Sequence, residues 1–148
     1  MSIVRRTTTA LTVLAATAAL TSAFGGVASA QAPTPCGRSA EACVDLSSNQ
    51  AWLMDSGAVS YGPVPITSGK PGYETPPGVF KVSYKDRDHR SSLYNNAPMP
   101  YSVFFNGGIA FHAGSLREQS HGCIHLSSEA AKTFFYDLQP SDVVQVVP

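Results

Sequence analysis

Turn-forming residues interrupt the chain at short intervals between positions 42 and 106, and this spacing favours strands over long helices. The region opens with short apolar segments that are separated by turns rich in Ser, Asn, Asp and Gly. Apolar segments this short, bounded by such turns, are typical of antiparallel strands. We therefore predict an opening meander of three strands, at residues 43–46, 51–54 and 58–61.

Two further patterns predict strands later in the chain. Residues 79–85 alternate between apolar and polar side chains, as in a strand with one buried face. The side chains expected on that buried face are those of Phe80, Val82 and Tyr84. Segments 101–106 and 109–112 flank Gly107-Gly108, a dipeptide that favours a tight hairpin turn.

The C-terminal part of the chain contains the only clear helix signal. Ser127 or Ser128 can cap a helix that continues to about Leu138 and presents apolar residues at helical spacing. A final apolar segment, 143–147, predicts one more strand. We therefore predict a mainly β fold, a β-sandwich or partly open barrel, with one helix packed on it near the C-terminus.

Two long irregular segments, 62–77 and 86–100, separate the predicted strands. For the first, an ordinary surface crossing and a role in lining a cleft are equally compatible with its many turn formers. The second has the length of loops that serve as lids or walls of binding sites. His89 lies there among four charged residues, so we expect it to be solvated.

The N-terminus has the features of a secretory signal peptide. Arg5-Arg6 precedes an apolar stretch, 7–24, and Ala28-Ser29-Ala30 provides a cleavage site. A membrane anchor is the alternative, but threonines dilute the apolar stretch that a span of about 20 residues requires. We expect residues 1–30 to be removed from a secreted, extracytoplasmic protein, by either the general or the twin-arginine export route.

After this peptide we expect an N-terminal segment, 31–42, and one domain, 43–148. Without Arg5 and Arg6 the chain has eight basic residues against ten acidic ones, a net charge of −2. Nucleic-acid binding needs clustered Lys and Arg, and these eight residues are scattered. We therefore expect no nucleic-acid partner, and we expect a monomer.

The chain has three cysteines, an odd number for an exported protein. Cys36 and Cys43 are close in sequence, within a segment of Gly, Ser and other small residues, and can close a small loop. We predict a disulfide between them, which leaves Cys123 as a free thiol. A free thiol is a liability in an oxidising compartment, so its presence indicates a function.

The segment from His112 to His125 combines this thiol with three of the four histidines of the chain. A neighbouring imidazole, from His112 or His121, can accept the thiol proton and lower the pKa of the thiol. Gly122 lets the backbone turn tightly beside Cys123, with amide N–H groups available to a developing oxyanion. These residues predict a cysteine acyl-transfer site.

A zinc site is the competing interpretation of the same residues. Zinc accepts imidazole and thiolate ligands, and the candidates are His112, His121, Cys123 and His125. The pattern lacks the glutamate of hydrolytic zinc motifs, however. We therefore favour the thiol and expect no bound metal or other cofactor.

The site segment resembles the signature of a known family. Ser-His-Gly-Cys-Ile at 120–124, with His112 upstream, is similar to the L,D-transpeptidase catalytic domain family, YkuD, of bacterial cell-wall enzymes. Thr-Pro-Pro-Gly-Val-Phe at 75–80 resembles that family's Thr-Pro-x-Gly segment, and 99–112 resembles the strand pair leading into the site. The resemblance covers residues 43–147 and implies a β-rich fold.

The resemblance also implies roles for individual residues. Cys123 matches the nucleophile, and His112 matches the histidine that accepts and donates the proton. The backbone around Gly122 and Cys123 matches the oxyanion hole, and the backbone carbonyl of Ala113 would orient His112. The residues that would form the rest of the site are Ser120, His121 and His125.

Two features depart from the family pattern. His125 stands where most relatives carry Arg or Asn, two positions after the cysteine. The stretch between His112 and Cys123 is also shorter than in many relatives, which implies a more open cleft.

The implied reaction is acyl transfer between peptidoglycan stem peptides, through a thioester on Cys123, to give 3→3 cross-links. Carbapenems are the implied covalent inhibitors. Water as the acceptor would make the protein a carboxypeptidase that trims stems. A non-catalytic wall-binding module, a zinc-dependent hydrolase and a cysteine peptidase or amidase are the remaining alternatives.

Overall fold

The computed structural model of the chain describes residues 34–148. The predicted signal peptide lies outside the described residues, so its prediction stays untested. No helix within the described range is long and apolar enough to cross a membrane.

The first sheet contains the predicted meander. Its strands lie in the order β3-β2-β1-β9-β4, with β1 paired antiparallel to β2 and parallel to β9. The strands at 43–46, 51–54 and 143–147 are thereby confirmed, with small shifts at their ends. The strand at 58–61 is also present, but it continues to Pro65, into the predicted irregular segment 62–77. The bounds are β1 Ala42–Asp45, β2 Gln50–Asp55, β3 Ala58–Pro65, β4 Gly78–Lys81 and β9 Val143–Val147.

The second sheet carries the predicted hairpin through Gly107-Gly108, which is confirmed as the β6–β7 turn. The strand order is β5-β6-β7-β8, and β7 and β8 pair in parallel. The short strand β8 follows Cys123 directly and was not predicted. The bounds are β5 Tyr84–Arg90, β6 Pro98–Asn106, β7 Ile109–Ala113 and β8 Ile124–Leu126.

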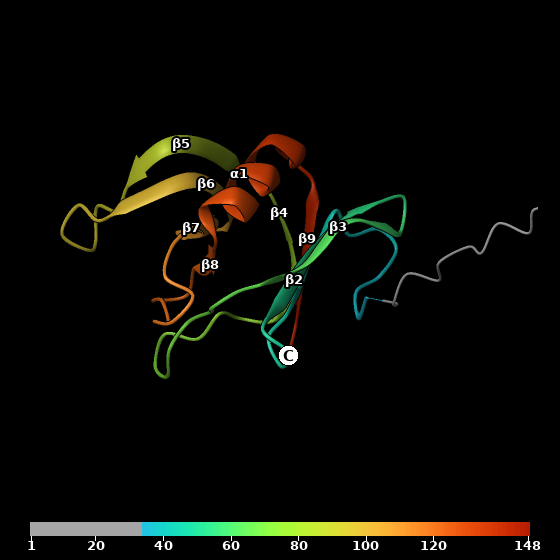
Figure 1. Cartoon of the computed structure of the whole chain (residues 1–148), viewed down its shortest axis with the longest axis horizontal. Coiled ribbons are helices and arrows are strands. Elements are labelled where there is room, and N and C mark those ends of the chain that lie inside the picture. Colours follow the sequence, from blue (N-terminus) through green and yellow to red (C-terminus); the bar gives the residue numbers. More distant parts are fainter. Residues whose placement is uncertain (1–33) are drawn as a thin grey trace, which may run out of the picture. The chain divides into compact units, whose positions relative to one another are not determined.

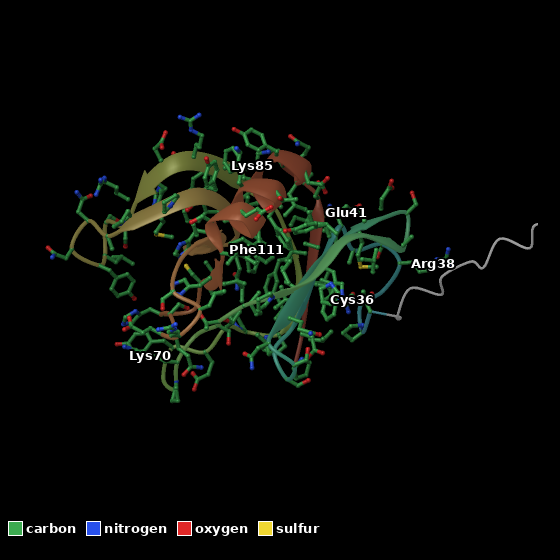
Figure 2. All side chains as sticks on the ribbon, in the orientation of Figure 1. Cys36, Arg38, Glu41, Lys70, Lys85 and Phe111 are labelled. Carbon is green, nitrogen blue, oxygen red and sulfur yellow. A yellow bond between two sulfur atoms is a disulfide. The ribbon has the colours of Figure 1, made fainter. Side chains whose placement is uncertain are left out.

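The predicted helix is confirmed as α1, Ser128–Asp137. Its N-cap is Ser127, whose side-chain oxygen accepts a hydrogen bond from the N–H of Ala130 at 3.1 Å. The helix packs mainly against β6 and β7 (Figure 1). The core lies between the two sheets and this helix, and fully buried Phe111 is at its centre (Figure 2). The architecture is therefore mainly β, with two sheets that do not close into a barrel.

The predicted strand 79–85 is wrong as a single element, because the chain changes sheets between Val82 and Ser83. Val82 N–H donates to the carbonyl of Asp142, beside the first sheet, whereas Ser83 N–H donates to the carbonyl of Phe104 in the second. Alternation across such a corner does not keep one face buried. Val82 is buried as expected, but Tyr84 stacks on Phe104 with 47% of its surface exposed.

The second irregular segment is also shorter than predicted. Its charged start belongs to β5, and its end belongs to β6, because the two strands pair from Tyr84↔Phe104 to Arg90↔Pro98. Charged side chains are compatible with an edge strand, which exposes one side to water. Only residues 91–97 remain as a loop.

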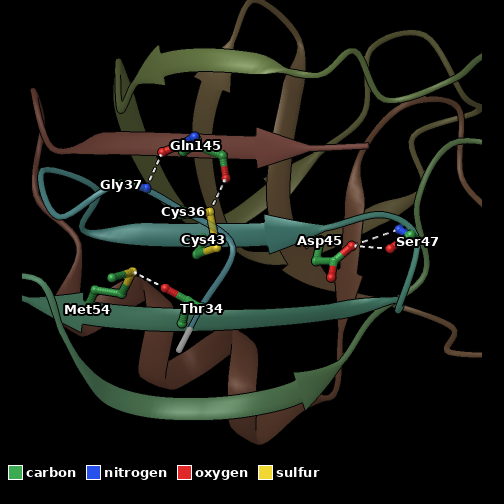
Figure 3. Close-up of a disulfide and its surroundings, with 8 residues drawn as sticks. All are labelled: Thr34, Cys36, Gly37, Cys43, Asp45, Ser47, Met54 and Gln145. Carbon is green, nitrogen blue, oxygen red and sulfur yellow. Dashed lines mark hydrogen bonds between the residues drawn. A yellow bond between two sulfur atoms is a disulfide. The ribbon is translucent and has the colours of Figure 1, made fainter. Parts of the chain in front are cut away.

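The predicted disulfide between Cys36 and Cys43 is present, and Cys123 is the free cysteine. The disulfide ties the segment before β1 to the face of that strand opposite the main core, where Trp52 and Met54 cluster with Cys43 (Figure 3). The same segment is attached to β9, because Gly37 N–H donates to the side-chain oxygen of Gln145 at 2.8 Å.

A lysine from β5 completes the C-terminal end of α1, which has no basic residue in its own last turn. The Nζ of Lys85 donates to the carbonyls of Phe135 at 2.8 Å and Leu138 at 2.6 Å (Figure 2). The last carbonyls of a helix have no partner within the helix and carry its negative dipole end. Lys85 therefore anchors the helix to the second sheet.

We expect Lys85→Met to lower the free energy of unfolding by about 1–3 kcal/mol, because it leaves these carbonyls without a charged donor. Lys81→Met is the matched control, since Lys81 is exposed on β4. Urea denaturation of both variants checks the expectation. Equal stability of the two variants would contradict the role of Lys85.

Candidate active site

The parallel pairing of β7 and β8 places the key side chains on one face of the second sheet. Phe111 lies opposite Ile124, and both point into the core. Because side chains alternate along a strand, His112 on β7 and His125 on β8 face the other way, and Cys123 directly precedes β8. His112 is paired with His125, so Cys123 lies two positions along the chain from the partner of His112.

These side chains open into a cavity of about 550 Å³. The cavity walls come from β5, β6, β7, the site segment and the 91–97 loop, so part of the second irregular segment lines a cavity. All four histidines of the chain line it. The lining residues used below are Tyr94, Gly108, His112, Ala113, Gly114, Ser120, Cys123 and His125, with His89 and His121.

His112 is held in one orientation. Its Nδ1 lies 2.9 Å from the carbonyl oxygen of Ala113. A carbonyl only accepts, so Nδ1 carries the proton and Nε2 is left as the acceptor. Burial lowers the pKa of His112 to about 4, with smaller contributions from His125 and His89. The ring is therefore neutral, with a free acceptor nitrogen, at neutral pH.

The side chain of His112 is buried, with only 6% of its surface exposed. It therefore contributes more to the packing of the domain than an exposed side chain at the edge of a cleft would.

The thiol of Cys123 is partly buried beside the hairpin turn. Its Sγ lies 3.7 Å from the carbonyl oxygen of Gly108. Burial raises the pKa of the Cys123 thiol, and a hydrogen bond from the backbone of Ala110 opposes this only in part. The expectation of a lowered pKa is therefore wrong, because desolvation of the thiolate outweighs the local donors. The resting site holds a neutral thiol and a neutral imidazole.

The backbone around the thiol is fixed by two hydroxyl groups. Ser120 Oγ accepts from Gly122 N–H at 3.0 Å and donates to the carbonyl of Cys123. Thr75 Oγ1 donates to the carbonyl of Gly122 at 2.8 Å. Gly122 itself has a φ of 111°, in a region that favours glycine. Ser120 and Gly122 are thus brought to the thiol, as expected.

His121 lies between two aromatic rings. It stacks on Tyr94 from the 91–97 loop, with centroids 4.2 Å apart, and meets the edge of Tyr73 at 4.6 Å. The side chain is exposed at the rim of the cavity. It joins two loops across the rim rather than approaching His112.

His125 is fixed beside His112. Its Nδ1 lies 3.0 Å from the carbonyl oxygen of Ser115, and the two imidazole centroids are 4.8 Å apart. The ring covers Gly114 so closely that a Cβ atom there would come within 2.6 Å of it. His125 is therefore held by backbone oxygens, by the hydroxyl of Thr67 at 3.2 Å and by its contact with Gly114.

His89 is a cavity residue that sequence reasoning missed, since we expected it to be solvated. It is partly buried, with Nδ1 3.0 Å from Asp86 Oδ2 and its ring edge-on to Phe104. The pairing of β5 with β6 carries it there, opposite Met99. No local signal in a charged segment predicts that pairing.

Within residues 34–148 no group of three or more His, Cys, Asp or Glu side chains is placed to hold a metal ion. The four candidate zinc ligands line one cavity, but His121 points to the aromatic rings of Tyr73 and Tyr94.

The model of the L,D-transpeptidase catalytic domain family, YkuD, matches residues 39–146. An L,D-transpeptidase from Stackebrandtia nassauensis is 31% identical and has a TM-score of 0.69. The match covers 72% of this chain and 54% of that one. An L,D-transpeptidase from Mycobacterium tuberculosis H37Rv is 25% identical, with a TM-score of 0.67 and coverages of 72% and 57%.

A third similar structure is an LD transpeptidase in complex with imipenem, 26% identical, with a TM-score of 0.66 and coverages of 72% and 57%. The chain thus spans a little over half the length of these structures. Among curated proteins, none matches the chain.

The low pKa of His112 predicts a specific loss of stability in acid. Between pH 6.5 and 4 the unfolded chain binds a proton at this residue that the folded protein does not, so stability falls as the pH is lowered through this window. His112→Gln removes this effect. From pH 7 to pH 4.5 we expect the variant to lose about 2–3 kcal/mol less unfolding free energy than the wild type. Urea denaturation at the two pH values measures it, and identical losses would refute the buried neutral imidazole.

Proposed function

The chain belongs to the L,D-transpeptidase catalytic domain family, YkuD, and on this premise we propose that it is a cysteine acyltransferase that acts on peptidoglycan stem peptides. The observation that carries the proposal is the arrangement of Cys123 and His112. Both line one cavity, His112 from β7 and Cys123 from the position directly before β8, and His112 turns its acceptor nitrogen away from Ala113.

The first half of the reaction forms a thioester. Nε2 of His112 takes the proton of the Cys123 thiol as sulfur attacks the carbonyl carbon of the third residue of a tetrapeptide stem. The C–N bond to the terminal D-alanine then breaks, and His112 returns the proton to the leaving amine. Because thiol and imidazole are both neutral at rest, the proton moves only as the attack proceeds.

Charge that develops on the carbonyl oxygen needs a donor close to the sulfur. The backbone N–H of Cys123 is the group that we assign to this role. Thr75 holds the carbonyl of Gly122, and Ser120 holds the N–H of Gly122 and the carbonyl of Cys123. These hydrogen bonds on both sides of the Cys123 N–H support the assignment.

The second half of the reaction transfers the acyl group. A side-chain amine from another stem attacks the thioester, His112 accepts its proton, and the Cys123 thiol is released. The product is a 3→3 cross-link. With water as the acceptor the same steps would trim the stem, and the open cavity is compatible with either acceptor.

The remaining cavity residues support this chemistry in separate ways. His125 sits against His112 and contributes to its low pKa, which keeps the base neutral. His121 connects the loops at the rim. We further propose that the protein works outside the cytoplasmic membrane, in the cell wall, because the first thirty residues have the pattern of a signal peptide.

Incubation of the protein with a disaccharide-tetrapeptide should release D-alanine and give a mass adduct on Cys123. Added acceptor stem should then yield a cross-linked dimer, and mass spectrometry distinguishes this product from the trimmed tripeptide. His112→Gln should slow acylation by about 10²–10⁴-fold. Cys123→Ala should abolish acylation. If the wild-type protein binds stem peptides without turning them over, it is a wall-binding module and the proposed function is wrong.

Imipenem provides an independent test, because one of the similar structures is a complex with it. We expect imipenem to acylate Cys123 as a stable thioester, in the presence of a chelator as well as without it, since the proposed step needs only the thiol and its base. Intact-mass and peptide analysis locate the adduct, and Cys123→Ala should remain unmodified. Loss of the reaction on chelation, together with stoichiometric zinc in the untreated protein, would favour a zinc enzyme.

A further inference from the structure

A buried hydroxyl outside the cavity makes a direct contact with the backbone of the site. Thr75 lies in the segment between β3 and β4 and is only 3% exposed. Its Oγ1 donates to the carbonyl of Gly122 at 2.8 Å and accepts from the N–H of Gly69 at 3.0 Å. The side chain is not among the residues that line the cavity. The direct contact of Thr75 with the site is therefore the one with Gly122.

The direction of the Thr75 hydroxyl is determined by Gly69. A hydroxyl has one proton, and because Gly69 N–H occupies an acceptor position, that proton points to Gly122. Gly69 approaches so closely that a Cβ atom would lie 1.9 Å from the carbonyl oxygen of Tyr73. Only glycine allows this close turn.

The same segment is bonded along the site loop on both sides of this contact. Ser120 N–H donates to the carbonyl of Ser68 at 2.9 Å, and Lys70 N–H donates to the carbonyl of Ser120 at 3.0 Å. Residues 68–75 thus lie against residues 120–122 as a fixed support. Part of the first irregular segment therefore supports the backbone of the site and does not line the cavity.

The contact with Gly122 has a consequence for the next residue. The peptide bond between Gly122 and Cys123 is planar, so the Gly122 carbonyl and the Cys123 N–H point in opposite directions. A hydrogen bond that fixes the carbonyl also fixes the N–H. Gly122 has a positive φ, which glycine adopts readily because it has no Cβ atom. The same lack of a Cβ atom gives its backbone more rotational freedom than any other residue would have, and that freedom must be restrained.

We propose that Thr75 is a positioning residue that aims the backbone N–H of Cys123 at the oxyanion. The proposal rests on the proposed function, in which this N–H stabilises the tetrahedral intermediate. Thr75 restrains the peptide plane from the carbonyl side, while Ser120 holds the N–H of Gly122 and the carbonyl of Cys123.

Two reactions of the same thiol separate this role from a structural one. Alkylation by iodoacetamide is a displacement at a saturated carbon and needs no oxyanion donor. Acylation by p-nitrophenyl acetate passes through a tetrahedral oxyanion and does not assume a stem-peptide substrate. We expect Thr75→Val, which keeps the shape but removes the hydroxyl, to slow acylation by about 10²-fold and to leave alkylation within about twofold.

Thr75→Ser is the matched control, because it keeps the hydroxyl, and both of its rates should stay within a few-fold of the wild type. Equal loss of both reactions in Thr75→Val, or unchanged acylation, would overturn the proposal. If Thr75→Val does not fold by circular dichroism, the ratio of the two rates in Thr75→Ala decides in the same way. Failure of the wild type on stem peptides, with these ratios as expected, would reject the substrate and not the role of Thr75.

Discussion

The parallel pairing of β7 with β8 is the constraint on which the site depends. Its register sets Phe111 opposite Ile124 and directs both into the core. The same register turns His112 and the thiol of Cys123 to the opposite face. A shift by one residue would exchange the two sets, so that Phe111 would leave the core and His112 would point into it. The hydrophobic core and the reactive face are therefore specified by one set of backbone hydrogen bonds.

Cys123 and His112 are both uncharged at rest, whereas the backbone beside them is held by several hydrogen bonds. Burial opposes ionisation of both Cys123 and His112, so the resting pair gains no stability from charge separation. The backbone on the other side of the thiol is fixed by neutral hydroxyl groups, Ser120 and Thr75. Such a site stabilises charge only when charge develops during the reaction, which is the condition for differential stabilisation of a transition state.

Local signals in the sequence predicted most of the fold. Turn residues predicted the meander and the β6–β7 hairpin, and capping predicted α1, because each depends on neighbours in the sequence. The change of sheet at Val82 and the position of His89 escaped prediction, since both depend on the pairing of β5 with β6, which the charged residues of β5 do not indicate. For Thr75, resemblance indicated the residue, but its contact with Gly122 spans 47 positions and has no local pattern.

The placement of all four histidines around one cavity gives the protein a built-in set of reporters. Once any purification tag is removed, every imidazole resonance in a proton or nitrogen NMR spectrum arises from this cavity. Ligand titrations can then be followed at natural sequence, without introduced labels. A ligand that binds elsewhere would leave the imidazole resonances unchanged, so the histidine spectrum alone would distinguish occupancy of the cleft from binding at any other surface.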